Sequence, residues 1–146
     1  MSAPFHFRLG RLLSVRRVGE DEALARLSEG RREVAARESE VEARSAERTD
    51  AEAEIRARAR GSVDLTRLRA AVTYRESANR RFARAEASAK SASMEAEEKR
   101  RALVEAARRV RILEKLEEGA RADWSARGLA AESRERDDRP HRGEPA

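Results

Sequence analysis

Arg60-Gly61-Ser62-Val63-Asp64-Leu65 is the only strong helix break inside this chain of 146 residues. Gly61 can adopt the left-handed conformation that closes a helix, and either Asp64 or Ser62 can cap the helix that follows. All three prolines lie near the ends of the chain, so residues 5–139 contain none of them. The sequence therefore predicts one long helix on each side of this break.

The two predicted helices, about 5–60 and about 65–132, are joined by a turn at 61–64 that is short enough to make them antiparallel. At 1.5 Å per residue they would be roughly 80 and 100 Å long. The expected fold is all-α, an antiparallel coiled-coil hairpin over residues 1–132, with both termini at one end and the turn at the other. Residues 133–146 are highly charged and lack large apolar side chains, so they are predicted to form a disordered tail.

The second predicted helix carries apolar residues at coiled-coil spacing. With Phe82 at heptad position a, fourteen of the seventeen a and d positions are apolar. The a positions are Leu68, Arg75, Phe82, Ala89, Ala96, Leu103, Val110, Glu117 and Trp124, and the d positions are Ala71, Ala78, Ala85, Ala92, Lys99, Ala106, Leu113 and Ala120. The first helix has no clean second row, so its contact face is expected to be narrower; its one row is Leu13, Glu20, Leu27, Val34, Val41, Arg48 and Ile55.

The composition argues against a large globular core, because 42% of the residues are charged and only 3% are aromatic. Cys is absent, which excludes a disulfide framework and thiolate metal sites and fits a reducing compartment. No apolar run approaches the ~18 residues needed to cross a bilayer, and no stretch is typical of a signal peptide. We therefore expect a cytosolic protein.

Basic residues are concentrated in two blocks of the sequence. Residues 1–19 carry four Arg and no acid, and residues 56–84 carry nine Arg against two acids. The second block could bind nucleic acid, but Phe82 falls on the seam, which leaves Tyr74 as the single candidate for base stacking. A solvated arginine face is the preferred interpretation. Tyr74 lies beside the seam and is equally consistent with a packing role and with an exposed contact.

The sequence offers no group of residues suited to catalysis. His6 and His141 are the only histidines, so neither a metal cluster nor a His-based triad can be assembled. Carboxylate pairs such as Glu97-Glu98 lie among Arg and Lys at helical spacing, where solvated ion pairs are the ordinary explanation. No glycine loop of the kind that cradles phosphate is present. We therefore expect no catalytic residue, cofactor, metal or small-molecule substrate, and a protein that is not an enzyme.

The N-terminal segment crowds apolar and basic side chains together, which suggests a protein partner. The apolar ones are Phe5, Phe7, Leu9, Leu12, Leu13 and Val15, and the basic ones are Arg8, Arg11, Arg16 and Arg17. Trp124 is expected at the same end of the hairpin. Packing of Trp124 on Phe5 and Phe7 as an aromatic plug is favoured over a role in binding a partner.

Three stretches of the chain resemble the flagellar FliJ family. Phe5-His-Phe-Arg-Leu-Gly-Arg-Leu-Leu-Ser-Val-Arg-Arg17 is similar to the family's opening, with alternating aromatics, a Leu pair and basic residues, continued here by Glu20, Ala23 and Leu27. Arg111-Ile-Leu-Glu-Lys-Leu-Glu117 is similar to a late Leu-Glu-Lys-Leu stretch of the family. The turn from Gly61 to Leu68 falls where those proteins fold back.

The resemblance implies a stalk component of the flagellar type III protein export apparatus, cytoplasmic and peripheral at the cytoplasmic face of the inner membrane. Its terminal end would insert into the hexameric export ATPase, its turn end would approach the membrane export gate, and some relatives also handle export chaperones. The residues expected to contact the ATPase ring are Phe5, Phe7, Arg8, Leu9, Arg11, Leu12, Leu13, Arg16 and Arg17. Those expected to contact the export gate are Arg60, Leu65, Arg67, Arg69 and Tyr74.

Two other functions compete with this one. A homo-oligomeric coiled-coil scaffold would pair the a and d rows between chains and make Gly61 a mere kink in one continuous helix. A nucleic-acid-binding coiled coil would depend on the arginines of residues 56–84 and would lose affinity steeply with salt. The scaffold is the stronger alternative.

Overall fold

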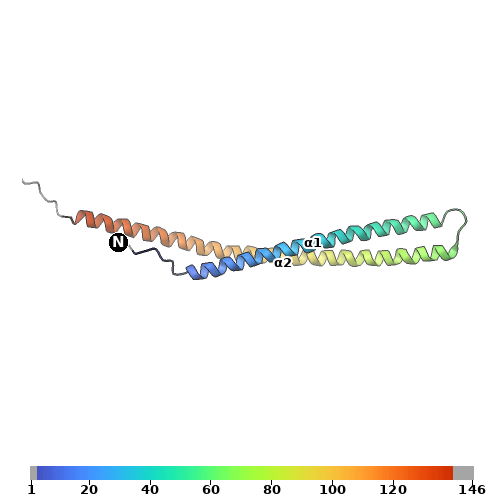
Figure 1. Ribbon diagram of the computed structural model, residues 1–146, viewed down its shortest axis with the longest axis horizontal. Helices are drawn as coiled ribbons and strands as arrows, with labels where there is room; N and C mark the ends of the chain where they lie inside the picture. Colours follow the sequence, from blue (N-terminus) through green and yellow to red (C-terminus); the bar gives the residue numbers. More distant parts are fainter. Residues whose placement is uncertain (1–2, 140–146) are drawn as a thin grey trace, which may run out of the picture. The chain divides into compact units, whose positions relative to one another are not determined.

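The computed structural model describes residues 3–139 and contains two helices, α1 (Gly10–Arg58) and α2 (Leu65–Asp137). They run in opposite directions and are joined by residues 59–64 (Figure 1). The described residues contain no strand. The prediction of an all-α helical hairpin is therefore confirmed.

Both outer helix ends differ from the predicted boundaries. α1 begins at Gly10 rather than near residue 5, after a turn in which the Gly10 amide donates to the Phe7 carbonyl at 3.0 Å. α2 continues to Asp137, so the first residues of the predicted tail are helical. The helix extends beyond residue 132 because Arg134, Glu135 and Arg136 favour helix, and because Arg136 forms an ion pair with Glu132 at 4.0 Å. Residues 140–146, including His141, lie outside the described residues.

The hairpin divides into two compact units. Of the described residues, 3–22 and 104–139 form the terminal unit, and residues 23–103 form the turn unit. Each unit contains a segment of α1 packed against a segment of α2.

The seam of the turn unit is made largely of alanine. On α2 the d positions Ala71, Ala78, Ala85 and Ala92 are all buried, as the heptad pattern predicts. On α1 a second row at spacing seven lies beside the predicted one. Its buried members are small, and its arginines are half-buried; the row is Ala23, Gly30, Arg37, Arg44 and Ala51. Glycine and the aliphatic stems of arginines occupy seam positions here without a large apolar side chain.

Gly30 marks a close approach of the two helices within the turn unit. A Cβ atom at Gly30 would lie 3.1 Å from Cδ of Lys99 and 3.6 Å from Cα of Ala96. Lys99, one of the three polar interruptions of the α2 seam, is half-buried there. Glycine thus makes room for a lysine stem at a position where two larger side chains would collide.

The turn forms as the sequence predicts. Gly61 has a φ of 70°, the left-handed conformation that the sequence predicts, and lies three residues after Arg58, where α1 ends. Of the two candidate caps, Asp64 is the one used, since its Oδ1 accepts hydrogen bonds from the amides of Thr66 (3.0 Å) and Arg67 (3.4 Å). The carboxylate thereby satisfies two of the free amides at the start of α2.

The terminal unit has a small aliphatic core. Leu13 of α1 is 3% exposed and packs with Val110 and Leu113 of α2, while Leu9 packs against this cluster from the edge. Val110 and Leu113 are among the bulkier apolar residues that the sequence places toward the C-terminal part of α2. The core fixes the two helix segments of this unit against each other and so determines which side chains remain outside.

Candidate partner-contact surfaces

Some of the predicted ring-contact residues hold the terminal unit together. Leu13 is buried in the core and Leu9 packs on it, so both side chains contribute to internal packing more than to the exposed surface. Phe7 is half-buried. The remaining contacts predicted on α1 and just before it, Arg8, Arg11, Leu12, Arg16 and Arg17, are exposed.

Phe5 and Trp124 form an aromatic pair in the terminal unit. Their ring centroids are 5.9 Å apart and their planes meet at 61°, an edge-to-face arrangement. The guanidinium carbon of Arg121 lies 4.7 Å from the centroid of the Phe5 ring. The predicted packing of Trp124 on Phe5 is therefore confirmed, although Trp124 remains 40% exposed. Phe5 is engaged with α2 on one side and half-buried overall.

Four large apolar side chains of the terminal unit are exposed on one side of the helix pair. We call them the terminal apolar face: Leu12, Val15, Ile112 and Leu116, which are 41–61% exposed. With Leu13 and Val110 at position a of their helices, Leu12 and Leu116 occupy g positions and Val15 and Ile112 occupy c positions. In an antiparallel pair the two g rows flank the same side of the seam, so the four residues share a face.

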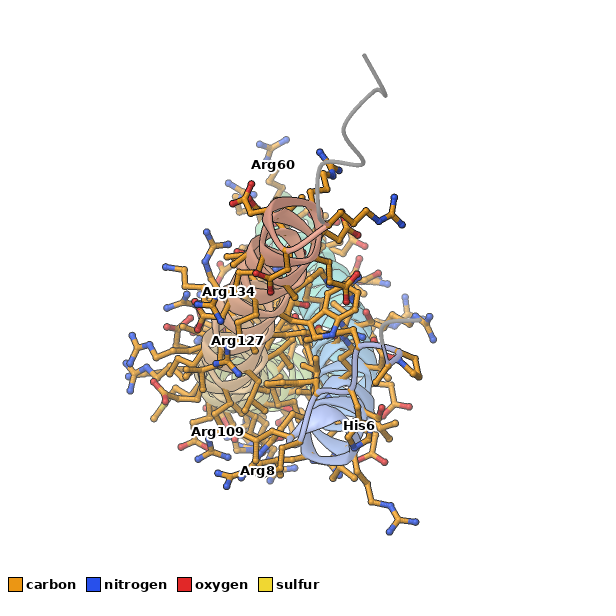
Figure 2. All side chains as sticks on the ribbon, turned by 90° about the vertical axis from the view of Figure 1, so that its left-hand side faces the viewer. His6, Arg8, Arg60, Arg109, Arg127 and Arg134 are labelled. Carbon is orange, nitrogen blue, oxygen red and sulfur yellow. The ribbon has the colours of Figure 1, made fainter. Side chains whose placement is uncertain are left out.

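The opposite side of the terminal unit carries an ion pair across the seam. Arg17 and Glu114 occupy e positions and form an ion pair at 3.4 Å across the seam. Arg8, in the turn before α1, and Arg109, at a g position of α2, are exposed basic residues of this unit, and both lie in the lower part of the view in Figure 2. The sequence interpretation included Leu12 and Val15 but missed Ile112 and Leu116, which only the heptad register of α2 could have identified.

The predicted gate-contact residues are all exposed in the turn unit. Arg67 pairs with the capping carboxylate of Asp64 at 3.5 Å. Tyr74 is 47% exposed, and the guanidinium carbon of Arg81 lies 5.6 Å from the centroid of its ring. Tyr74 is thus exposed, with Arg81 near its ring. Leu65 lies at the same turn, and Arg60 and Arg69 form no ion pair among residues 3–139.

An open groove that the sequence did not predict lies along the turn unit. It encloses about 760 Å³ between Val41 of α1 and Ala83, Ala87 and Ala89 of α2, because alanine leaves space beside the seam. Glu38, Glu42, Glu86 and Lys90 line its rim. Its lining contains no His, Cys, Ser or Thr.

The ionisable residues whose pKa is shifted form ion pairs on the surface. Hydrogen bonds from Arg100 lower the pKa of Glu97 below its ordinary value, with further contributions from the charges of Arg100 and Arg101. A hydrogen bond from Arg37 to Glu33 likewise raises the pKa of Arg37. Within residues 3–139 there is no group of three or more His, Cys, Asp or Glu residues that could hold a metal ion, and no helix that could span a membrane.

Comparison with known protein families identifies the chain. The family model described as "Flagellar FliJ protein" matches residues 5–142. The chain belongs to the FliJ family. FliJ proteins are non-catalytic components of the flagellar protein export apparatus, and the match spans both helices and both surfaces described above. No curated protein sequence and no solved structure matches this chain.

Proposed function

We propose that this FliJ protein is a non-enzymatic stalk that links the flagellar export ATPase to the export gate. Its terminal unit inserts into the ATPase hexamer, and its turn end contacts the membrane-embedded gate. Export chaperones are further partners in this proposal. The protein would then act at the cytoplasmic face of the inner membrane.

The terminal apolar face is the observation that carries the proposal. A well-packed core lies directly beneath it, so these four side chains are exposed for a reason other than poor packing. Arg8, Arg11 and Arg16 are exposed beside it and form no ion pair within the described chain. An apolar centre with a basic rim fits a protein surface that is apolar at its centre and acidic around it.

The buried residues of the predicted ring contact also hold the terminal unit together. Leu9 and Leu13 fix α1 on α2, and Phe5 fixes the segment before α1 on Trp124. These residues determine how Leu12 and Arg8 are presented to the ring. Substituting them would disturb the fold of the terminal unit as well as the contact, so they are poor probes of the contact alone.

A non-catalytic role is supported by the arrangement of the charged groups. The carboxylate of Glu97, for example, lies on the helix surface and pairs with Arg100 and Arg101. Its pKa is lowered rather than raised. A general acid or base at neutral pH would need burial that shifts its pKa toward neutrality. The side chains therefore serve solubility, helix stability and partner contact.

The proposal is tested by measuring binding of the full chain to the purified export ATPase from the same source. The test variant is Leu12→Ser/Leu116→Ser, which removes two exposed leucines from the terminal apolar face. We expect its affinity to fall about 10-fold or more, because each buried leucine contributes on the order of 1.5–3 kcal/mol at an interface. Circular dichroism checks that both helices persist.

The matched control is Val18→Ser/Leu129→Ser. These residues lie in the same unit and are 57% and 69% exposed, but outside the terminal apolar face. The control should bind within about twofold of the unmodified chain, as expected for surface changes outside a contact. Equal loss in both variants would show a non-specific hydrophobic contact, and no loss in either would exclude this face from the ATPase contact.

A further inference from the structure

The turn exposes two aliphatic side chains at the tip of the turn unit. Leu65 is 71% exposed, the highest fraction among the exposed large apolar residues of the described chain, and Val63 is 44% exposed. The cap formed by Asp64 lies between them and turns the backbone into α2. Because Asp64 accepts hydrogen bonds from the amides of Thr66 and Arg67, these two donors stay paired when Val63 and Leu65 leave water.

Arginines surround these two aliphatic side chains. Between Glu54 and Glu76 the sequence holds six arginines and one acid, Asp64. That single carboxylate is already occupied by the amides of Thr66 and Arg67 and by the Arg67 guanidinium. Arg58 is likewise paired with Glu54 at 2.7 Å.

Three arginines remain available around the turn. Arg56, Arg60 and Arg69 are exposed and form no ion pair within residues 3–139. Arg56 lies in the last turn of α1, Arg60 in the connection and Arg69 in the second turn of α2. The tip thus combines uncompensated positive charge with exposed aliphatic groups.

We propose that the turn binds the surface of an anionic lipid bilayer. The arginines contact lipid phosphates in the headgroup layer, and Val63 and Leu65 enter the boundary between headgroups and acyl chains. Two aliphatic side chains at the tip of a basic hairpin suit shallow insertion. Neither helix has to leave its partner for the contact to form.

A lipid surface fits this tip better than a nucleic acid does. Phosphate on RNA or DNA would engage the arginines but would leave Val63 and Leu65 in water, and no aromatic ring lies between Arg56 and Arg69 for stacking on bases. A bilayer can contact the arginines and the two aliphatic side chains at the same time. The inference goes beyond the proposed stalk function, because it requires lipid and no protein of the gate.

The test is flotation of the full chain with vesicles that contain no protein. Vesicles of equal parts phosphatidylglycerol and phosphatidylcholine should carry the chain upward, and vesicles of phosphatidylcholine alone should not. Raising the salt concentration should weaken the binding because screening acts on the arginine contacts. Binding to neutral vesicles that equals binding to anionic ones would overturn the proposal.

Two sets of variants separate the charge from the insertion. Arg56→Gln/Arg60→Gln/Arg69→Gln should lower partitioning on the order of 100-fold, about fivefold for each arginine. Val63→Ser/Leu65→Ser, which keeps every charge, should lower it about 10-fold or more. If the serine variant binds like the unmodified chain, the contact is purely electrostatic and the proposed insertion is wrong.

Matched controls change the same residue types elsewhere. Arg26→Gln/Arg32→Gln/Arg111→Gln removes three exposed arginines that make no ion pair among the described residues. Val18→Ser/Leu129→Ser removes two exposed aliphatic residues away from the turn. Both should float nearly as well as the unmodified chain. Losses equal to those of the turn variants would show that net charge or hydrophobicity alone drives binding, and would overturn the assignment to the turn.

The gate contact is tested separately. Binding to the ATPase and to the solubilised gate is measured on the unmodified chain without vesicles. If the unmodified chain binds the gate but does not float with anionic vesicles, the lipid contact alone is overturned. If it floats but does not bind the gate, the lipid contact is supported and the gate contact is excluded.

Discussion

The guanidinium carbon of Arg48 lies 4.2 Å from the centroid of the Phe82 ring, across the seam of the turn unit. The Arg48 Nε also donates a hydrogen bond to Oδ1 of Asn79 at 3.1 Å. In the heptad pattern Arg48 interrupts an apolar row. The structure shows that it fills its position by covering an aromatic ring of the other helix.

We predict that Arg48→Gln lowers the free energy of unfolding by about 0.5–2 kcal/mol, because it removes the cation–π contact at a half-buried position. Urea unfolding followed by circular dichroism measures this change. A double-mutant cycle with Phe82→Leu should show a coupling energy, whereas Arg32→Gln, an exposed control without an ion pair, should leave stability nearly unchanged. Zero coupling between Arg48 and Phe82 would contradict the contact.

Substitution by alanine should change the free energy of unfolding differently at two glycines of α1. Gly19 has open space around it, so Gly19→Ala should stabilise the protein by about 1 kcal/mol through helix propensity alone. Gly30→Ala should gain less, because its Cβ would lie 3.1 Å from Cδ of Lys99 and the lysine stem must shift. Gly30→Leu should destabilise by about 1–3 kcal/mol, since the larger side chain meets the backbone of Ala96. Thermal or urea unfolding decides the order, and a Gly30→Leu variant as stable as the unmodified chain would contradict the close approach.

Trp124 provides an internal probe of the terminal unit, because it is the only tryptophan of the chain. Phe5→Ala should shift its fluorescence emission to longer wavelength, as water replaces the ring that lies 5.9 Å away, and should cost about 0.5–1.5 kcal/mol beyond the lost burial. Tyr74→Ala, in the turn unit, should leave the emission unchanged. An unchanged spectrum in Phe5→Ala would show that Phe5 does not pack on Trp124 in solution.

Glu97 should titrate below the ordinary range for glutamate. Arg100 donates two hydrogen bonds to it, at 2.9 and 2.8 Å, and so lowers the pKa of Glu97. A lowered pKa in the folded state means that the pair stabilises the fold above the pKa of the unfolded chain, and that this contribution is lost as the pH falls through the folded pKa. Arg100→Gln should raise the pKa of Glu97 toward its ordinary value, as measured by NMR of the side-chain carboxyl carbon. A pKa that stays the same in this variant would rule out the hydrogen bonds as the cause.

Much of the fold could be predicted from the sequence because its strongest signals are local. Gly61 and Asp64 mark the turn by their own conformational and capping preferences, and the alanine row of α2 repeats at a fixed spacing. The second row of α1 could not be predicted in the same way. It is built from Gly30 and the arginine stems of Arg37 and Arg44, whose suitability depends on what α2 places opposite them.

The candidate surfaces were predictable only in part. A count of apolar and basic residues located the terminal unit and the turn, but it could not separate Leu13, which is 3% exposed, from Leu12 beside it. Ile112 and Leu116 became candidates only once the register of α2 against α1 placed them on the side of Leu12. Contact surfaces of a coiled coil depend on which flank of the seam a residue occupies, and that is a property of the pair of helices.

The central claim, that this FliJ protein enters the ring of the export ATPase, is tested most directly by the mass of the complex. Sedimentation of the purified ATPase with increasing amounts of the full chain, sized against each protein alone, measures both assembly and stoichiometry. The account predicts that the chain promotes ATPase hexamers and saturates at one chain per hexamer, and that Leu12→Ser/Leu116→Ser shifts this assembly to higher concentration. Binding of one chain to every ATPase subunit, or no binding to a folded ATPase, would contradict insertion into the ring.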